Sequence, residues 1–355
     1  MHFGINPALL CIFLQIVNIN GHLSNLAWNG GPLHLQCERE SDFWMRSGQY
    51  IKENVIAVKA IMHQDDVFVM TPRLKPGVLA TFWLIVKDKS QVELQPYPEL
   101  RDHSVGDCSA IQNAVDMYLD HLGKLWVLDS GIVDTVASPQ CTCPPKVVLI
   151  NLLLRKLVKR IDISSLLEAT SLIQNIVVEY EFGKTFIYVS DASRGAILVH
   201  EVTSGASWSV VTCAPATGLQ ILLVKRPAHT VLILVRLHYQ GIIELDTTAL
   251  RRRDSLTPLT VFGEQSKPVV LLGADGFHVY LRHTECSDVL VWNTKDPYNS
   301  SRLDNIHSAG PRLTTTSVAA EPLKRILLIL DTNYLDTLQG NSPTYHRITF
   351  VSKNN

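Results

Sequence analysis

A short apolar phrase recurs six times along the 355-residue chain, at intervals of 45 to 61 residues. Each copy is rich in β-branched or aromatic residues, which is typical of a buried strand. Intervals of this size indicate repeated supersecondary units rather than several unrelated domains. The six copies are Asp66–Met70, Lys124–Asp129, Thr185–Asp191, Thr230–Val235, Gly276–Leu281 and Arg325–Asp331.

Further strand-like segments flank every copy of the phrase. One apolar segment follows each copy, as Lys146–Asn151 does, and another precedes it, as Ala114–Leu119 does. More polar segments such as Leu157–Ile163 and Ser207–Val211 suit an exposed outer edge. Four antiparallel strands in each of six units predict an all-β fold, a six-bladed β-propeller that forms a single domain over residues 22–355.

The two ends of the chain are expected to share one blade. The last unit ends soon after its third strand, and the segment Leu33–Glu38 stands before the first unit. Pairing these two regions would remove an open sheet edge. We therefore predict ring closure by an N-terminal strand, with the region around Leu35 beside the strand around Phe350.

An apolar run near the N-terminus predicts export. The run Ala8–Val17 is too short to cross a bilayer but fits the core of a signal peptide. We predict a signal peptide over residues 1–21 and a secreted, extracellular mature protein. The second strongly apolar stretch, Ile221–Leu237, is interrupted by charged residues and a proline, so it is not expected to span a membrane.

The cysteines agree with export. Removal of Cys11 with the signal peptide leaves an even number, which in an exported chain suggests disulfides. The sequence does not choose among the pairings, although Cys141 and Cys143 are expected to take different partners. A metal site at these two cysteines is the alternative, but no second pair at zinc-site spacing accompanies them. The disulfide candidates are Cys37, Cys108, Cys141, Cys143, Cys213 and Cys286.

Charge and motif content exclude several classes of function. The formal net charge is −1, so no global field favours nucleic acid or an anionic membrane, and neither partner is expected. The sequence lacks a Gly-x-Ser-x-Gly elbow, a His-Glu-x-x-His helix and a phosphate-binding glycine loop. We therefore assign no catalytic residue, no metal ligand and no cofactor. Asn299 begins a glycosylation sequon and is expected on the surface.

Three aspartates end the recurring phrase in their units and would lie near one rim of the ring. The candidate channel-rim ligand site consists of Asp129, Asp191, Arg194 and Asp331. One interpretation is a carboxylate collar that attracts a cationic amine. The other is that each aspartate caps a turn. His238 could act as a proton shuttle in a tautomerase, or be a solvated surface residue.

Several stretches resemble the insect yellow and major royal jelly proteins. They are Gly48–Asn54, Val67–Thr81, Leu125–Gly131, Cys143–Leu152 and Tyr188–Gly195. The resemblance implies a secreted six-bladed propeller. Members of that family are associated with cuticle melanisation, eggshell assembly, royal jelly as a food protein and capture of biogenic amines in saliva, and some are reported to speed dopachrome conversion. The resemblance supplies no family-wide catalytic set.

The chain also departs from the family pattern. Residues 120–123 lack the cysteine that usually precedes the Leu125 phrase, and an additional cysteine stands at 141 or 143, so a rewired disulfide set is expected. Three functions remain open. The first is a non-catalytic protein of an extracellular insect matrix, eggshell or cuticle, that binds matrix proteins. The second is a dopachrome-converting enzyme of melanin synthesis, and the third is a binder of a small aromatic amine or catechol.

Overall fold

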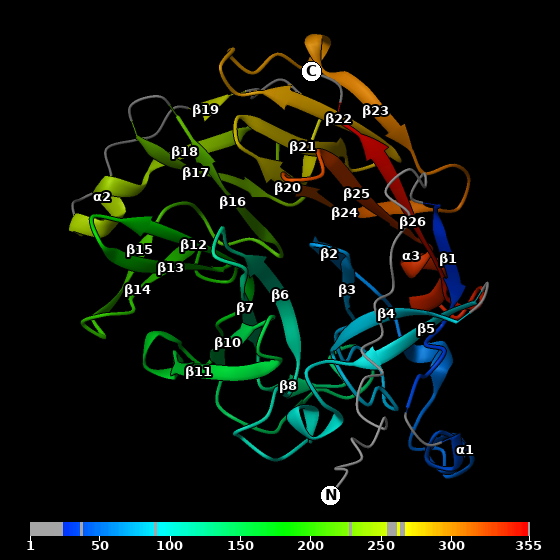
Figure 1. The fold of residues 1–355 in the computed structure, drawn as a ribbon. Helices are drawn as coiled ribbons and strands as arrows, with labels where there is room; N and C mark the ends of the chain where they lie inside the picture. Colours follow the sequence, from blue (N-terminus) through cyan, green and yellow to red (C-terminus); the bar gives the residue numbers. More distant parts are fainter. Residues whose placement is uncertain are drawn as a thin grey trace, which may run out of the picture.

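The computed structural model describes residues 24–35, 38–88, 91–226, 229–253, 261–262 and 267–353. The predicted signal peptide and Cys37 lie outside these ranges. Six four-stranded antiparallel sheets stand around a common centre like the blades of a propeller (Figure 1). The predicted six-bladed β-propeller is therefore confirmed.

The first five blades take their strands in chain order from the centre outwards. The first blade contains β2 (Lys59–His63), β3 (Asp66–Met70), β4 (Phe82–Asp88) and β5 (Gln91–Pro96), and the second contains β6 (Ala114–Leu119), β7 (Lys124–Asp129), β10 (Lys146–Asn151) and β11 (Lys156–Asp162). The third contains β12 (Ile173–Glu181), β13 (Lys184–Asp191), β14 (Ala196–Glu201) and β15 (Ser207–Val211). The fourth contains β16 (Leu219–Lys225), β17 (Thr230–Arg236), β18 (Ile242–Asp246) and β19 (Val261–Phe262).

The last two blades complete the ring. The fifth contains β20 (Val269–Asp275), β21 (His278–His283), β22 (Asp288–Asn293) and β23 (Asp304–Ser308), and the sixth contains β24 (Thr314–Glu321), β25 (Ile326–Thr332), β26 (Tyr345–Ser352) and β1 (Leu26–Asn29). The recurring phrase is the second strand of every blade. We call the face where first strands begin the upper face, and the face where hairpins join first to second strands the lower face.

The ring closes through an N-terminal strand, but not the one that the sequence suggested. β1 pairs with β26 in antiparallel register, Leu26 opposite Ile348 and Trp28 opposite His346. The predicted donor, 33–38, is wrong: Leu33 instead forms a parallel bridge with Leu94, beside the outer strand of the first blade. β1 is only four residues long, and its alternate side chains are buried. Such a short segment gives a weak pattern, whereas residues 33–38 alternate apolar and polar side chains over a longer stretch.

The helices found in the described part of the chain are few and lie outside the blades. They are α1 (Glu38–Arg46), α2 (Thr247–Arg252) and α3 (Tyr334–Leu338), with 3-10 turns at Lys52–Asn54, Leu100–His103, Ser164–Leu166 and Ser300–Arg302. Within the described ranges, no helix has the length and apolar character needed to cross a bilayer. The long loop after β7 contains a small hairpin of β8 (Ile132–Val133) and β9 (Gln140–Cys141).

Side-chain hydrogen bonds or ion pairs cross all six junctions between blades. They add directional links to the apolar clusters that fill the same gaps, because each joins a side chain to a group on the next blade. In order around the ring, the pairs are Lys59 Nζ with Asp116 Oδ1 (2.6 Å), Ile176 N with Asp116 Oδ2 (2.8 Å), Leu219 N with Gln174 Oε1 (2.7 Å), Leu271 N with Gln220 Oε1 (2.8 Å), Arg282 Nε with Thr315 O (3.0 Å) and Ala60 N with Ser317 Oγ (3.0 Å).

Candidate functional site

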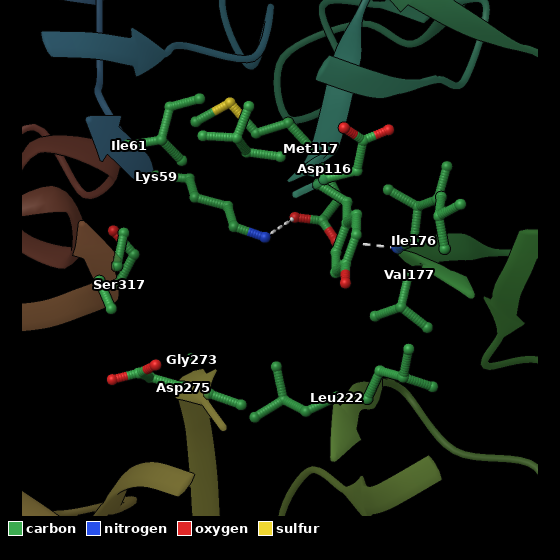
Figure 2. Close-up of a pocket in the computed structure, with 18 of the residues that line it drawn as sticks. Lys59, Ile61, Asp116, Met117, Ile176, Val177, Leu222, Gly273, Asp275 and Ser317 are labelled. Carbon is green, nitrogen blue, oxygen red and sulfur yellow. Dashed lines mark hydrogen bonds and ion pairs between the residues drawn. The ribbon is translucent and has the colours of Figure 1, made fainter. Parts of the chain in front are cut away.

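A central channel of about 960 Å³ runs through the ring and is lined by the first strands of all six blades. Figure 2 shows Lys59 extending towards Asp116 across one side of this channel. Asp116 is buried and also accepts hydrogen bonds from Ile176 N and from Asn175 Nδ2 (3.1 Å). Its charge is therefore balanced within the protein.

Two other acidic side chains of the channel wall also have partners within the protein. Asp120 accepts hydrogen bonds from Trp126 Nε1 (2.9 Å) and from the Tyr180 hydroxyl. Glu179 accepts from the Tyr188 hydroxyl and from Arg251, each at 2.6 Å. Burial, reinforced by the neighbouring Glu179, raises the pKa of Tyr188 well above its usual range. These carboxylates act as internal acceptors and are not available to pair with a ligand cation.

A second cavity of about 640 Å³ opens on the upper face between the second, third and fourth blades. The loop after β7 and the crossing from the second to the third blade form most of its wall. The wall combines apolar side chains with hydroxyl and amide groups. These residues include Ile132, Pro145, Leu167 and Leu172 on the apolar side, and Ser130, Ser164, Ser171, Gln174, Asn175 and Gln220 on the polar side.

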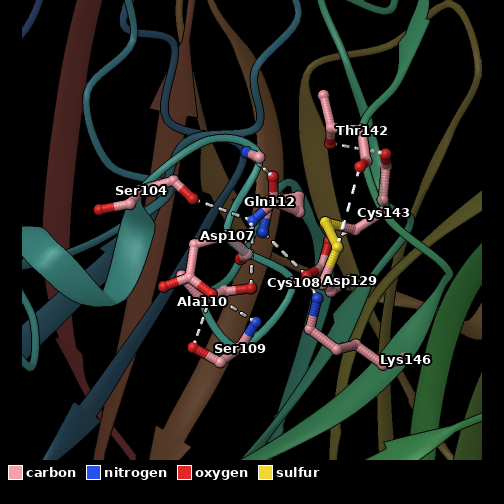
Figure 3. The surroundings of a disulfide bond; sticks show 12 residues. Ser104, Asp107, Cys108, Ser109, Ala110, Gln112, Asp129, Thr142, Cys143 and Lys146 are labelled. Atoms are coloured by element: carbon pink, nitrogen blue, oxygen red, sulfur yellow. Dashed lines mark hydrogen bonds and ion pairs between the residues drawn. A yellow bond between two sulfur atoms is a disulfide. The ribbon is translucent and has the colours of Figure 1, made fainter.

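A disulfide joins Cys108 to Cys143 (Figure 3), and Cys143 lines this upper cavity. It ties the segment before β6 to the long loop after β7. Cys141, Cys213 and Cys286 are free thiols, so Cys141 and Cys143 differ in state, and Cys37 lies outside the described ranges. Burial raises the pKa of the Cys213 thiol.

The three rim aspartates are fully buried, and each joins the end of a second strand to the start of a first strand. Asp129 accepts from Gln112 N and Asn113 N, both at 2.8 Å, and pairs with Lys146 (2.8 Å). Asp191 accepts from Leu172 N (2.9 Å) and Ser171 Oγ (2.6 Å). These contacts are those of the turn-capping interpretation.

Asp331 has the same role in the sixth blade. It accepts from Thr315 Oγ1 (2.7 Å), His307 Nε2 (2.9 Å) and Arg347 (2.7 Å). Burial alone would raise the pKa of Asp331, but the hydrogen bonds from His307, Thr315 and Arg347 outweigh it and hold the pKa below its usual range. Arg194, the fourth rim candidate, lies 3.0 Å from Glu168 and 3.9 Å from Asp191.

Two further sequence candidates lie on the surface. His238 is exposed beyond the end of β17, near the site where Arg236 stacks on Tyr239 at 4.3 Å. Asn299 is exposed as expected, and its side chain accepts a hydrogen bond from Ser301 N (3.0 Å).

Sequence reasoning missed the charged residues of the channel wall. Lys59, Asp116 and Glu179 all belong to first strands, where the neighbouring residues are largely apolar. A charged residue inside an apolar strand is the signal that could have indicated them, since such groups stay buried only when paired.

The residues that carry the family resemblance are mainly structural. Arg73 is buried and donates to the carbonyl oxygens of Leu79 (2.6 Å), His103 (2.7 Å) and Val78 (2.8 Å), while burial lowers its pKa to about 10. Gly131 has φ +69°, and a Cβ there would lie 2.0 Å from the Cys143 carbonyl oxygen, so only glycine fits. These motifs fix the fold of the upper face rather than supply chemistry.

Known proteins resemble the chain over part of its length. The family model described as Major royal jelly protein matches residues 112–216. "Dopaminechrome tautomerase" of Drosophila melanogaster is 30% identical over 172 residues, 46% of this chain and 37% of that protein. "Protein yellow" of Drosophila simulans is 29% identical over 191 residues, 51% of this chain and 35% of that protein. The chain thus matches little more than a third of the length of these relatives.

Solved structures agree on the fold. The α-L-arabinanase of Penicillium chrysogenum, complexed with arabinobiose, has a TM-score of 0.53 at 11% identity and covers 92% of this chain and 98% of that one. An auxiliary nutrient binding protein of Bacteroides ovatus has a TM-score of 0.51 at 11% identity, with 92% and 77% covered. At such identity these structures speak for the architecture alone. The family match over residues 112–216 and the similarity to the yellow proteins agree with the resemblance to the yellow and major royal jelly protein family, and the six-bladed ring agrees with the fold which that resemblance implies.

Proposed function

We propose that the protein is secreted and acts in an extracellular insect matrix, eggshell or cuticle, by binding rather than by catalysis. The upper cavity carries this proposal. Its wall offers apolar surface and neutral hydrogen-bonding groups, the combination that holds a small aromatic or catechol ligand. None of the described residues that line it is a histidine, and Glu168 is engaged by Arg194 at 3.0 Å. Among the described lining residues, the carboxylate is thus already paired and Cys141 supplies a thiol, which does not make a matched acid and base for proton transfer.

Two features support an extracellular site of action. The Cys108–Cys143 disulfide lies at the surface, and such bonds persist in oxidising compartments. The exposed Asn299 sequon is accessible to glycosylation in an exported chain.

Dopachrome conversion is the alternative function, and one further observation favours it. His63 and His121 both line the lower mouth of the channel, and the ring of His121 lies edge-on to Tyr180 at 4.9 Å. Histidine side chains commonly serve as proton shuttles in enzymes. The similarity to a dopaminechrome tautomerase points the same way.

Calorimetry and an absorbance assay on the purified protein separate these functions. Binding predicts heat with both catechol and dopamine, because the proposed wall recognises the ring and hydroxyls rather than the amine. Ala169→Trp, which fills the upper cavity from its exposed rim, should abolish that heat. Thr316→Trp, which narrows the channel, is the matched control and should leave it unchanged.

The same preparation tests catalysis. If the protein only binds, dopachrome absorbance should fall at the same rate with the protein as without it. Turnover that disappears in His63→Gln or His121→Gln would favour the enzyme, and absence of heat with every ligand would contradict binding. Antibody staining of eggshell and cuticle tests the matrix role. Finding the protein only in body fluid would contradict that role.

A further inference from the structure

The lower face carries the most exposed large apolar side chains of the described residues. Phe182 is 91%, Leu323 87% and Leu153 81% exposed. Phe182 lies at the β12–β13 turn, Leu323 at the β24–β25 turn and Leu153 at the β10–β11 turn. Leu154 and Leu122 extend the set at the β10–β11 and β6–β7 turns. All these turns project from the same face, because first-to-second and third-to-fourth hairpins share one end of each blade.

The needs of the fold do not explain why a phenylalanine stands at position 182. Phe182 and Gly183 have φ values of +48° and +73°, a two-residue hairpin turn of the kind that favours Asn-Gly. A bulky aromatic residue is disfavoured in this left-handed conformation. A nearly fully exposed phenylalanine in that position contributes little packing, so a contact outside the domain accounts for it better.

Basic side chains stand directly behind the apolar tips. Lys124 follows Leu122 by two residues, and Lys184 follows Phe182 by two. The other tips are followed at once by the pairs Arg155–Lys156 and Lys324–Arg325. Lys184 pairs with Glu201 (3.2 Å), Lys324 pairs with Asp65, and Arg155 lies over the Tyr97 ring at 5.0 Å. Acidic residues interrupt this pattern, because Glu181 precedes Phe182, and Asp65 and Asp275 lie at the turns of the first and fifth blades.

Apolar tips with basic residues behind them match a lipid surface. The side chains protrude from four separate turns, and a folded partner would pack against a continuous apolar core instead. A bilayer is deformable, and its apolar phase is bordered by phosphate groups at the depth that the basic side chains would reach.

We propose that the lower face docks on an anionic phospholipid surface, with Phe182, Leu323 and Leu153 entering the acyl boundary and the lysines and arginines meeting headgroup phosphates. This departs from the expectation based on net charge, because a formal charge of −1 averages over faces that differ locally. The proposal is independent of the ligand bound on the upper face.

Flotation of the purified protein with vesicles tests the proposal. The protein should float with phosphatidylcholine vesicles that contain phosphatidylserine, much less with phosphatidylcholine alone, and salt should weaken the binding. Phe182→Asn should reduce the vesicle affinity about tenfold while raising the melting temperature, since asparagine suits the turn. Val211→Asn is the matched control, an exposed apolar residue at the upper end of β15 that should leave binding unchanged.

Three outcomes would overturn it. They are equal binding to neutral and anionic vesicles, no binding to either, or full binding by Phe182→Asn. A concentration-dependent dimer that Phe182→Asn converts to a monomer, without vesicle binding, would assign the face to a second copy instead.

Discussion

Asp116 of the second blade holds Lys59 of the first blade at 2.6 Å and the backbone N–H of Ile176 in the third at 2.8 Å. One carboxylate thus spans two of the six junctions. Arg251, after the fourth blade, also pairs with Glu179 of the third at 2.6 Å, and Arg282 links the fifth blade to the sixth. Gln174, Gln220 and Ser317 supply neutral links. The ring is therefore expected to depend more on Asp116 than on any single neutral link.

Replacing Asp116 should destabilise the domain more than replacing a neutral link. Asp116→Ala leaves a half-buried lysine and a buried amide without their partner, and should lower the free energy of unfolding by about 3 kcal/mol or more. Ser317→Ala removes one hydrogen bond to Ala60 N and should cost about 1–2 kcal/mol. Urea unfolding measures both. Equal losses would contradict the role of Asp116 as a three-blade junction.

Arg73 should tolerate even a conservative change poorly. Its planar guanidinium donates to several carbonyl oxygens that lie in different directions, which a lysine ammonium cannot reproduce. Arg73→Lys should lower the free energy of unfolding by about 3 kcal/mol, as measured by thermal or urea unfolding. Arg236→Lys, at a more exposed arginine stacked on Tyr239, is the control and should change stability little. A similar small loss of stability in Arg73→Lys and Arg236→Lys would contradict the structural role assigned to Arg73.

The protein should lose stability as the pH falls below neutrality. Burial lowers the pKa of both His103 and His346 to about 3, from the ordinary 6.5. Below pH 6.5 the unfolded chain takes up protons that the folded chain does not, so stability is full above pH 6.5 and declines towards pH 3. The slope is at most about 1.4 kcal/mol per pH unit for each histidine.

Variants isolate this effect. His103→Gln with His346→Gln should be less stable at neutral pH but should show a flatter decline between pH 6.5 and 4. His238→Gln, at an exposed histidine, should keep the wild-type slope. An unchanged slope in the double variant would show that other groups cause the decline.

The disulfide should stabilise the upper face. Cys108 and Cys143 are 35 residues apart, so their bond should contribute about 3–4 kcal/mol, which Cys108→Ser with Cys143→Ser would remove. Protease cleavage in the loop 129–145 should become faster in that variant. Cys141→Ser is the control and should be neutral, and a maleimide should label Cys141 readily in the native protein. Failure to label it would mean that Cys141 is bonded after all.

Sequence reasoning reached the strands because each buried strand carries its own local pattern. β3, β6, β7, β10 and β15 have the predicted bounds, and the other predicted strands differ from the structure by a few residues at their ends. α1 was missed because Glu38–Arg46 is largely polar, and its apolar residues do not recur at helical spacing. Pairing of Cys108 with Cys143 could not be predicted, since it depends on how two loops of one blade meet. The upper cavity likewise exists only once three blades are side by side.

Ring closure gives the last prediction, because it depends on four residues at one end of the described chain. Trp28 in β1 is buried and stacks on His346 in β26, with ring centroids 4.8 Å apart, while His346 Nε2 accepts from Ala57 N at 2.9 Å. Through this chain of contacts, β1 supports the junction between the sixth and first blades.

Trp28→Ala should therefore lower the free energy of unfolding by about 3–5 kcal/mol. The variant should unfold in one cooperative transition, because an opened ring exposes two blade faces. Phe43→Ala, at an exposed residue of α1, should change the melting temperature little. A Trp28→Ala protein that unfolds at the wild-type temperature would show that the ring holds without its N-terminal strand.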